Sequence, residues 1–261
     1  MTGAVLPLLA GVLGLLVGSF LNVVVYRLPR GESIVRPGSR CPSCGTPIAP
    51  RDNVPLVSWA LLRGRARCCG ARVPVRYPLV ELATGVAFAA VTVWLGPSWA
   101  LPAFLYLAAI SIALTLIDLA VHRLPDPIVL PSYLVGGLLL GVASLAAHDL
   151  GSVVRAAIGG AALWLLYLVL VLIYPAGMGL GDVKLAGVLG MYLGWLGWSE
   201  LAVGAFLGFL LGGLSGLGLM LAGRAGRKTM IPFGPFMLAG AWLAIVIAAP
   251  VASWYLGAFG V

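Results

Sequence analysis

Long apolar stretches follow one another along this chain, and they leave few folds open to it. Charged residues make up only 9% of the sequence, against about 25% in soluble domains. A helix that crosses a bilayer needs about 20 apolar residues, and lipid cannot satisfy exposed backbone groups, so such stretches cross as helices. The sequence therefore predicts an all-α polytopic membrane protein with about eight transmembrane helices. They are expected over residues 3–25, 79–96, 99–117, 128–147, 152–174, 183–199, 201–222 and 235–257.

The basic residues predict how these helices are oriented. Ten of the 16 Lys and Arg lie in residues 27–78, between the first two predicted helices. Cytoplasmic loops are enriched in Lys and Arg, so this loop is placed in the cytoplasm and the N-terminus outside. The net charge of +8 is then mainly a topology signal, which also suits anionic lipid headgroups and requires no nucleic acid. The same threading puts Arg123, Lys184, Arg224, Arg227 and Lys228 inside, and only Arg155 outside.

Two aspartates stand at the ends of predicted helices, where a charge is costly. Asp118 closes one apolar stretch, and Asp182 ends the run that starts at Gly177 and opens another. Charges inside a bilayer cost a few kcal/mol each and usually mark function. The predicted topology brings both carboxylates to the cytoplasmic face at similar depth, as water activation by a proton-sharing pair requires. The alternative is two unrelated charges tolerated at helix ends.

Neighbouring residues are expected to support this pair. Gly179 and Gly181 permit positive φ angles and close backbone approach, which suits a loop that admits an extended peptide. Lys184 either acts on Asp182 and the substrate, or extends its ammonium group to the lipid headgroups. Asp126, within a Leu-Pro-Asp-Pro break, is expected to cap the helix that follows.

Together these motifs resemble the type IV prepilin peptidases. The resemblance covers nearly the whole chain, with the motifs in family order. It implies a GxGD-type intramembrane aspartyl protease of the bacterial inner membrane, serving type IV pili and protein secretion. Such enzymes remove the short basic leader of pilin-like precursors after a glycine, at the cytoplasmic face. The matching segments are Gly179-Leu-Gly-Asp-Val-Lys-Leu185, Asp118-x7-Asp126, Gly18-Ser-Phe-Leu-Asn-Val-Val-Val-Tyr-Arg-Leu-Pro29 and Arg76-Tyr-Pro-Leu-Val-Glu-Leu82.

Carried over by position, Asp118 and Asp182 are the catalytic pair. Two close carboxylates in a poorly hydrated site cannot both ionise cheaply, so they share a proton and titrate as a unit. The ionised member deprotonates a water while the protonated member donates to the scissile carbonyl or the leaving amine. Peptide cleavage by this route needs no cofactor and no acyl-enzyme.

All four cysteines lie in the loop between the first two helices, as Cys41-Pro-Ser-Cys44 and Cys68-Cys69. In a reducing cytoplasm these are better read as thiols or metal ligands than as disulfides. Cys-x2-Cys is half of a zinc ribbon, and the full pattern needs a second such half. Related prepilin peptidases commonly supply it, whereas here Ala66 holds the expected third ligand position. Two interpretations of this loop are open. Either it binds zinc through Cys41, Cys44, Cys69 and Cys68, or it is a reduced structural loop.

The resemblance also implies methyl transfer, because two-domain bacterial members methylate the new N-terminus with S-adenosylmethionine. The sequence itself shows no glycine-rich nucleotide signature. Glu81 either binds an amine or pairs with Arg76, and Asn22 and Arg27 are expected to line the same region. The implied division is residues 1–96, with two helices and the cysteine loop, and residues 97–261, a six-helix peptidase domain.

Two other classes fit some of these features. A proton- or cation-coupled transporter would use Asp118 and Asp182, but transporters favour internal repeats and midplane sites, and neither is evident. A non-enzymatic membrane scaffold would use the basic loop to dock a partner, and would leave the paired aspartates unexplained.

Overall fold

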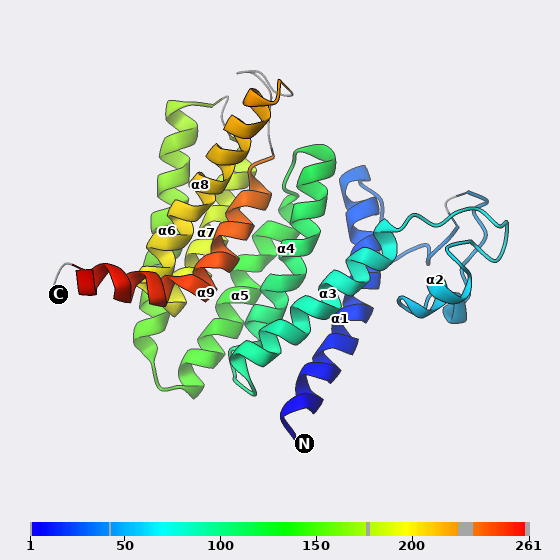
Figure 1. Cartoon of the computed structure of the whole chain (residues 1–261), viewed down its shortest axis with the longest axis horizontal. Coiled ribbons are helices and arrows are strands. Elements are labelled where there is room, and N and C mark those ends of the chain that lie inside the picture. Colours follow the sequence, from blue (N-terminus) through cyan, green and yellow to red (C-terminus); the bar gives the residue numbers. More distant parts are fainter. Residues whose placement is uncertain (1, 42, 176–177, 224–231, 259–261) are drawn as a thin grey trace. The chain divides into compact units, whose positions relative to one another are not determined.

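Helices make up almost all of the regular structure. The computed structural model describes residues 2–41, 43–175, 178–223 and 232–258, and within these ranges it contains no strand beyond two isolated β-bridges (Figure 1). The prediction of an all-α chain is confirmed. Its long helices are α1 (Thr2–Arg27), α3 (Arg76–Leu95), α4 (Leu101–Val121), α5 (Asp126–Ala146), α6 (Leu150–Ile173), α7 (Leu180–Leu196), α8 (Trp198–Leu221) and α9 (Gly234–Ala258). The loop between α1 and α3 holds the short elements η1 (Leu28–Arg30), η2 (Pro50–Asp52) and α2 (Val57–Leu61).

Seven of the long helices have the length and apolar composition needed to cross a membrane. Their outward-facing side chains are apolar, as the mostly exposed Leu134, Leu172 and Val246 illustrate. Such a surface suits lipid and not water. The eighth, α7, has only 17 residues and is not among the seven. It is buried on most sides by contacts with α5, α6, α8 and α9.

The contacts divide the chain into two units, Met1–Leu116 and Ile117–Val261. In the first unit α1 and α3 pack along each other (Figure 1). Glycines allow this close approach, because a Cβ on Gly14 would lie 2.6 Å from the Thr84 carbonyl oxygen. Small residues at such contacts let membrane helices bring their backbones together.

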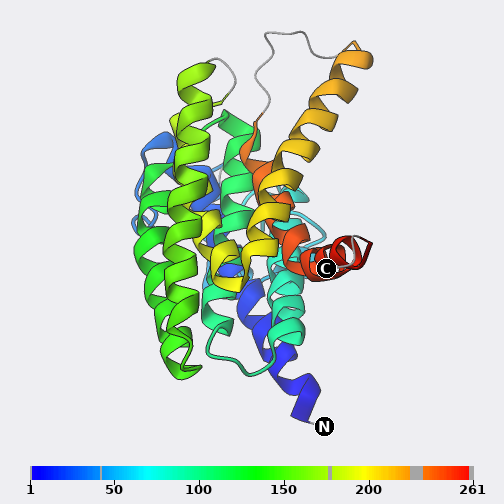
Figure 2. The same cartoon turned by 90° about the vertical axis from the view of Figure 1, so that its left-hand side faces the viewer.

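In the second unit α6 pairs with α7, and α8 pairs with α9 (Figure 2). Glycine-to-glycine contacts again account for both pairs. A Cβ on Gly159 would lie 2.6 Å from the carbonyl oxygen of Gly190, and one on Gly240 would lie 2.5 Å from the nitrogen of Gly208. These close approaches set how α7, which carries Asp182, packs on α6, and how α9 packs on α8.

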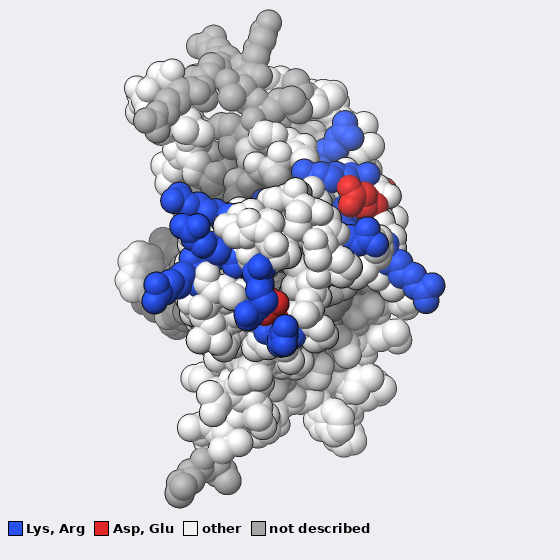
Figure 3. Space-filling model, turned by 90° about the vertical axis from the view of Figure 1, so that its right-hand side faces the viewer, with Lys and Arg blue, Asp and Glu red and all other residues white. Residues whose placement is uncertain are grey.

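The basic side chains are unevenly distributed. The face shown in the space-filling view carries many Lys and Arg side chains, spread across its middle, with few Asp and Glu among them (Figure 3). Of the residues used to predict orientation, Arg224, Arg227 and Lys228 lie outside the described residues, as does Gly177. The orientation therefore stays a prediction.

Candidate active site

Asp118 lies in the last turn of α4, which continues four residues beyond the stretch 99–117 expected from the sequence. Its side chain is buried, and its Oδ2 accepts a hydrogen bond from the backbone N–H of Gly234 at 3.1 Å. Gly234 is the first residue of α9. A Cβ at this position would lie 2.8 Å from the same carboxylate oxygen, so only glycine leaves the carboxylate undisturbed.

Asp182 lies in the first turn of α7 and is also buried. Its Oδ2 accepts a hydrogen bond from the N–H of Gly179, the residue before the helix, at 2.9 Å. An acidic side chain that reaches back to the N-cap in this way stabilises the start of a helix. The carboxylate is thereby held by its own loop.

Of the two glycines of this loop, only Gly181 makes a close approach, because a Cβ on Gly179 would meet nothing nearer than 3.8 Å. Neither uses the positive φ that glycine permits: Gly179 is extended with φ −96°, and Gly181 is in the helix. A Cβ on Gly181 would lie 3.1 Å from the Cβ of Leu124, so a larger residue would push against the segment that joins α4 to α5.

The two carboxylates share their surroundings. Leu124 contacts Gly181 on one side and Gly234 on the other, and the charges of Asp118 and Asp182 interact. Within the described part of the chain, each carboxylate has one oxygen held by a glycine N–H, while Oδ1 has no hydrogen-bond partner. Each carboxylate is therefore fixed and still has an oxygen with which to exchange a proton.

Lys184 has a different partner from those expected. Its Nζ donates to both oxygens of Asp126, at 2.7 and 2.9 Å, and both side chains are partly exposed. Asp126 begins α5 as predicted, but it makes no capping hydrogen bond, so its predicted capping role is wrong. A full positive charge within reach is a stronger partner for a carboxylate than a neutral backbone N–H.

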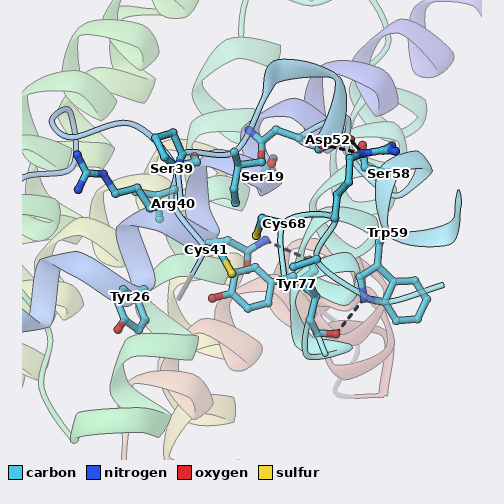
Figure 4. Close-up of a pocket in the computed structure, with 18 of the residues that line it drawn as sticks. Ser19, Tyr26, Ser39, Arg40, Cys41, Asp52, Ser58, Trp59, Cys68 and Tyr77 are labelled. Carbon is cyan, nitrogen blue, oxygen red and sulfur yellow. Dashed lines mark hydrogen bonds and ion pairs between the residues drawn. The ribbon is translucent and has the colours of Figure 1, made fainter. Parts of the chain in front are cut away.

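A second group of predicted residues meets in the first unit, where a pocket of about 700 Å³ opens beside the loop (Figure 4). Asn22, Arg27 and Glu81 all line it. Asn22 donates to a backbone carbonyl in the first turn of α3, and Arg27 donates to three loop carbonyls. Glu81 accepts the N–H of Leu56 at 2.8 Å, and its alternative pairing with Arg76 is not found among the described residues. Leu56 has φ +58°, a costly conformation that this bond helps to hold.

The rest of the pocket lining combines aromatic rings with charges. Tyr26, Trp59 and Tyr77 supply the rings (Figure 4). The indole N–H of Trp59 donates to a backbone carbonyl at 3.1 Å, which fixes that ring. Asp52 is paired with Arg67 at 2.9 Å. Among the described residues, the arginines of the lining whose side chains form no ion pair and donate to no loop carbonyl are Arg36, Arg40, Arg65 and Arg72.

The four cysteines come together beside this pocket. Their sulfur atoms all lie within 4.8 Å of one another, with Cys41 to Cys69 at 3.7 Å and Cys44 to Cys68 at 3.3 Å. A tetrahedral zinc site with Zn–S bonds of about 2.3 Å has sulfur–sulfur edges of about 3.8 Å. The thiols therefore fit a four-cysteine zinc site, including the displaced Cys68.

The backbone of the loop explains how the cluster forms although Ala66 stands where a third cysteine is expected. Two similar turns carry the cysteines: Gly45, at φ +72°, donates to the carbonyl of Cys41, and Gly70, at φ +71°, donates to the carbonyl of Ala66. Antiparallel bridges flank both turns, Arg40 with Pro47 and Arg65 with Arg72. Ala66 thus occupies in the second turn the place that Cys41 has in the first. Cys68, inside the turn, supplies the thiol that Ala66 lacks.

The thiols do not titrate alike. Hydrogen bonding with Thr46 lowers the pKa of Cys44 to about 6, whereas hydrogen bonding with Cys44 raises the pKa of Cys68 to about 12. Thiolates this close repel one another, so a cation is required before all four can ionise.

Comparison with known proteins places these residues in a family. The model of the bacterial peptidase A24 N-terminal domain matches residues 12–95, and that of the type IV leader peptidase family matches residues 105–221. A prepilin leader peptidase/N-methyltransferase from Aeromonas hydrophila is 38% identical, over 94% of this chain and 92% of that protein. The chain belongs to the type IV leader peptidase family. Proteins of the same description from Neisseria gonorrhoeae and Pectobacterium carotovorum are 38% and 40% identical, over 90% and 88% of this chain and 88% and 89% of theirs. No solved structure matches the chain.

The two family matches separate the two groups of candidate residues. Asp118 and Asp182 lie in the stretch matched by the leader peptidase family. Asn22, Glu81 and the cysteines lie in the N-terminal match. Membership confirms the family resemblance, and with seven spanning-length helices it makes the chain a bacterial membrane protein.

Proposed function

We propose that this chain is an aspartyl endopeptidase of the bacterial inner membrane that removes the leader of pilin-like precursors, with Asp118 and Asp182 as its catalytic pair. The observation that carries the proposal is that the two carboxylates have the same kind of environment. Both are buried, and each has one oxygen held by a glycine N–H and the other free. A lone buried charge is expensive, whereas two carboxylates that share a proton carry only one charge between them.

The free oxygens perform the chemistry. One carboxylate takes a proton from a water molecule as that water attacks the scissile carbonyl carbon, and the other gives its proton to the carbonyl oxygen. As the tetrahedral intermediate collapses, the ionised carboxylate takes back a proton from one of its two hydroxyl groups and the C=O bond re-forms. The C–N bond breaks, and the protonated carboxylate gives its proton to the leaving amine, which restores the pair. The N–H groups of Gly234 and Gly179 orient the carboxylates throughout. Neither family model favours the transporter or the scaffold alternative.

The arginines of the loop support a cytoplasmic placement of residues 27–78. Counting helices from there places the ends that carry the two aspartates on the same face, with the N-terminus outside. Cleavage then takes place at the cytoplasmic surface, just after a glycine of the basic leader.

Substitution of the carboxylates tests the peptidase proposal. Asp118→Asn and Asp182→Asn should each abolish cleavage of a purified pilin-like precursor, read by mass spectrometry, while the melting temperature stays close to wild type. The double variant should be little worse than either single one, because the two act as a unit. Asp149→Asn, which changes an exposed carboxylate paired with Arg155, is the matched control. A folded single variant that cleaves at the wild-type rate refutes the pair.

We also propose a second activity, methyl transfer to the new N-terminus, in residues 1–96, with residues 97–261 as the peptidase domain. The pocket of the first unit supports it, because 700 Å³ is within the usual range for small-molecule sites. Arg36 and Arg40 suit the carboxylate of S-adenosylmethionine, and the rings of Tyr26 and Tyr77 suit its adenine and sulfonium groups. When bound, this cofactor supplies an electrophilic methyl group. Glu81 is the candidate to hold the accepting amine.

The cysteine cluster would hold zinc as a structural brace for the loop that lines this pocket. Coordination free energy is folding free energy for such a loop. Titration calorimetry with S-adenosylmethionine, and mass spectrometry of the cleaved product with and without it, test the second activity. Binding that is unchanged in Glu81→Gln and in Arg40→Ala refutes the pocket as its site.

A further inference from the structure

Tyr167 of α6 is a buried phenol that the mechanism above does not use. Only 2% of the residue is exposed. Its hydroxyl lies at the contact between α8 and α9, since a Cβ on Gly208 would be 3.6 Å from that oxygen and 3.5 Å from the Cα of Met237. Across the described residues, no group hydrogen-bonds to this hydroxyl, yet its oxygen is not among the fully buried polar atoms left without a partner. The hydroxyl therefore keeps a small accessible surface, through which it can donate a hydrogen bond to a bound group.

The ring of Tyr167 is held by two phenylalanines. It stacks on Phe209, with 5.0 Å between ring centroids and 28° between planes. It also contacts Phe233 at 6.2 Å, and Phe209 and Phe233 contact each other at 5.6 Å. Aromatic packing of this kind fixes a ring, so the position of the hydroxyl is set by the fold.

This cluster is connected to both aspartates. Phe233 immediately precedes Gly234, whose N–H binds Asp118. On the other side, Tyr167 lies close enough to Asp182 for their charges to interact. Tyr167 therefore contacts the residue next to the anchor of one carboxylate and lies within electrostatic range of the other.

We propose that Tyr167 is a third catalytic residue, whose O–H donates a hydrogen bond to the substrate carbonyl oxygen as the tetrahedral intermediate forms. The proposal rests on the peptidase function proposed above. The carboxylates carry out every proton transfer, and the phenol keeps its proton throughout. A donor directed at developing negative charge stabilises the transition state more than the bound substrate, and a neutral phenol adds no further charge to a buried site.

Tyr167→Phe tests this, because it removes one oxygen and keeps the ring packing. Loss of a single donor of this kind lowers kcat by about 100- to 1,000-fold at well-aligned sites. With a neutral phenol donor we expect a fall of about 10- to 100-fold, an almost unchanged KM and an unchanged melting temperature. A peptide with a hydroxyl-bearing isostere at the scissile bond mimics the intermediate, and its affinity should fall more than that of the uncleaved substrate.

Tyr133→Phe is the matched control, because that phenol donates to a backbone carbonyl, that of Lys184, at 2.6 Å. Its loss should lower the melting temperature and leave kcat near wild type. Wild-type kcat in Tyr167→Phe, while Asp118→Asn is inactive, overturns the role of Tyr167 and leaves the peptidase intact. A fall in kcat that only tracks a lower melting temperature also overturns it. A wild-type chain that cleaves no precursor instead removes the peptidase function itself.

Discussion

Replacing Gly234 with alanine tests the carboxylate geometry without touching either aspartate. The added Cβ would lie 2.8 Å from Oδ2 of Asp118 and 3.2 Å from Cδ2 of Leu124, whereas ordinary contacts begin at 3.4 Å. The carboxylate must therefore move by about half an ångström or turn, because its Oδ2 is the atom nearest to the new methyl group. Either movement lengthens the 3.1 Å hydrogen bond from the Gly234 N–H.

The size of the effect follows from that bond. A hydrogen bond to a charged group is worth about 1.5–3 kcal/mol. Since about 1.4 kcal/mol corresponds to a factor of ten in rate, Gly234→Ala should lower kcat for precursor cleavage by about 10- to 100-fold. The fold should tolerate the change, because alanine is a better helix former than glycine and the site is at the start of α9.

Cleavage of a pilin-like precursor, followed by mass spectrometry, reports kcat and KM, and thermal unfolding reports stability. Gly141→Ala in α5 is the control, because a Cβ there meets nothing within 4 Å. Gly141→Ala should cleave like wild type. If Gly234→Ala also cleaves at the wild-type rate, the hydrogen bond from Gly234 to Asp118 has no part in catalysis, and the reasoning is refuted.

Three further outcomes are expected. The purified chain should hold close to one equivalent of zinc by elemental analysis. The Cys68→Ser variant should lose the zinc, and adding Ala66→Cys to that variant should restore it. A wild-type chain without metal refutes the zinc site. Cysteine labelling on a cysteine-free background should modify position 39 only after permeabilisation and position 98 in intact cells, and the opposite pattern inverts the proposed orientation. Gly159→Ala should force α6 and α7 apart and lower stability by about 1–3 kcal/mol, measured as a lower melting temperature; an unchanged value shows that the backbones have room.

The sequence predicts the helices well because each depends on local composition. Apolar length alone locates them to within a few residues, and the glycine-rich loop indicates Asp182 by its neighbours. Helix ends are less well predicted: α4 runs past Asp118, because a carboxylate that finds a partner in the fold does not have to end a helix.

Contacts between distant residues were not predictable in this way. Gly234 binds Asp118 across 116 positions, and no local pattern indicates which glycine of so many does so. The same holds for Lys184, whose partner Asp126 is 58 positions away. The cysteine spacing argued against a regular site, whereas the fold compensates by using Cys68 in place of a thiol at position 66. The usual Cys-x2-Cys spacing is one way for a backbone to bring four sulfur atoms together, and this loop brings them together with a different spacing.

The shortness of α7 has a consequence for how the membrane acts on the site. Seventeen residues rise about 26 Å, less than the hydrocarbon thickness of about 30 Å. A lipid-facing helix of that length would suffer hydrophobic mismatch and would thin the bilayer or tilt. α7 is surrounded by other helices instead, so acyl chains scarcely touch it. The depth of Asp182 is therefore set by protein packing, and lipids of different chain length do not move it.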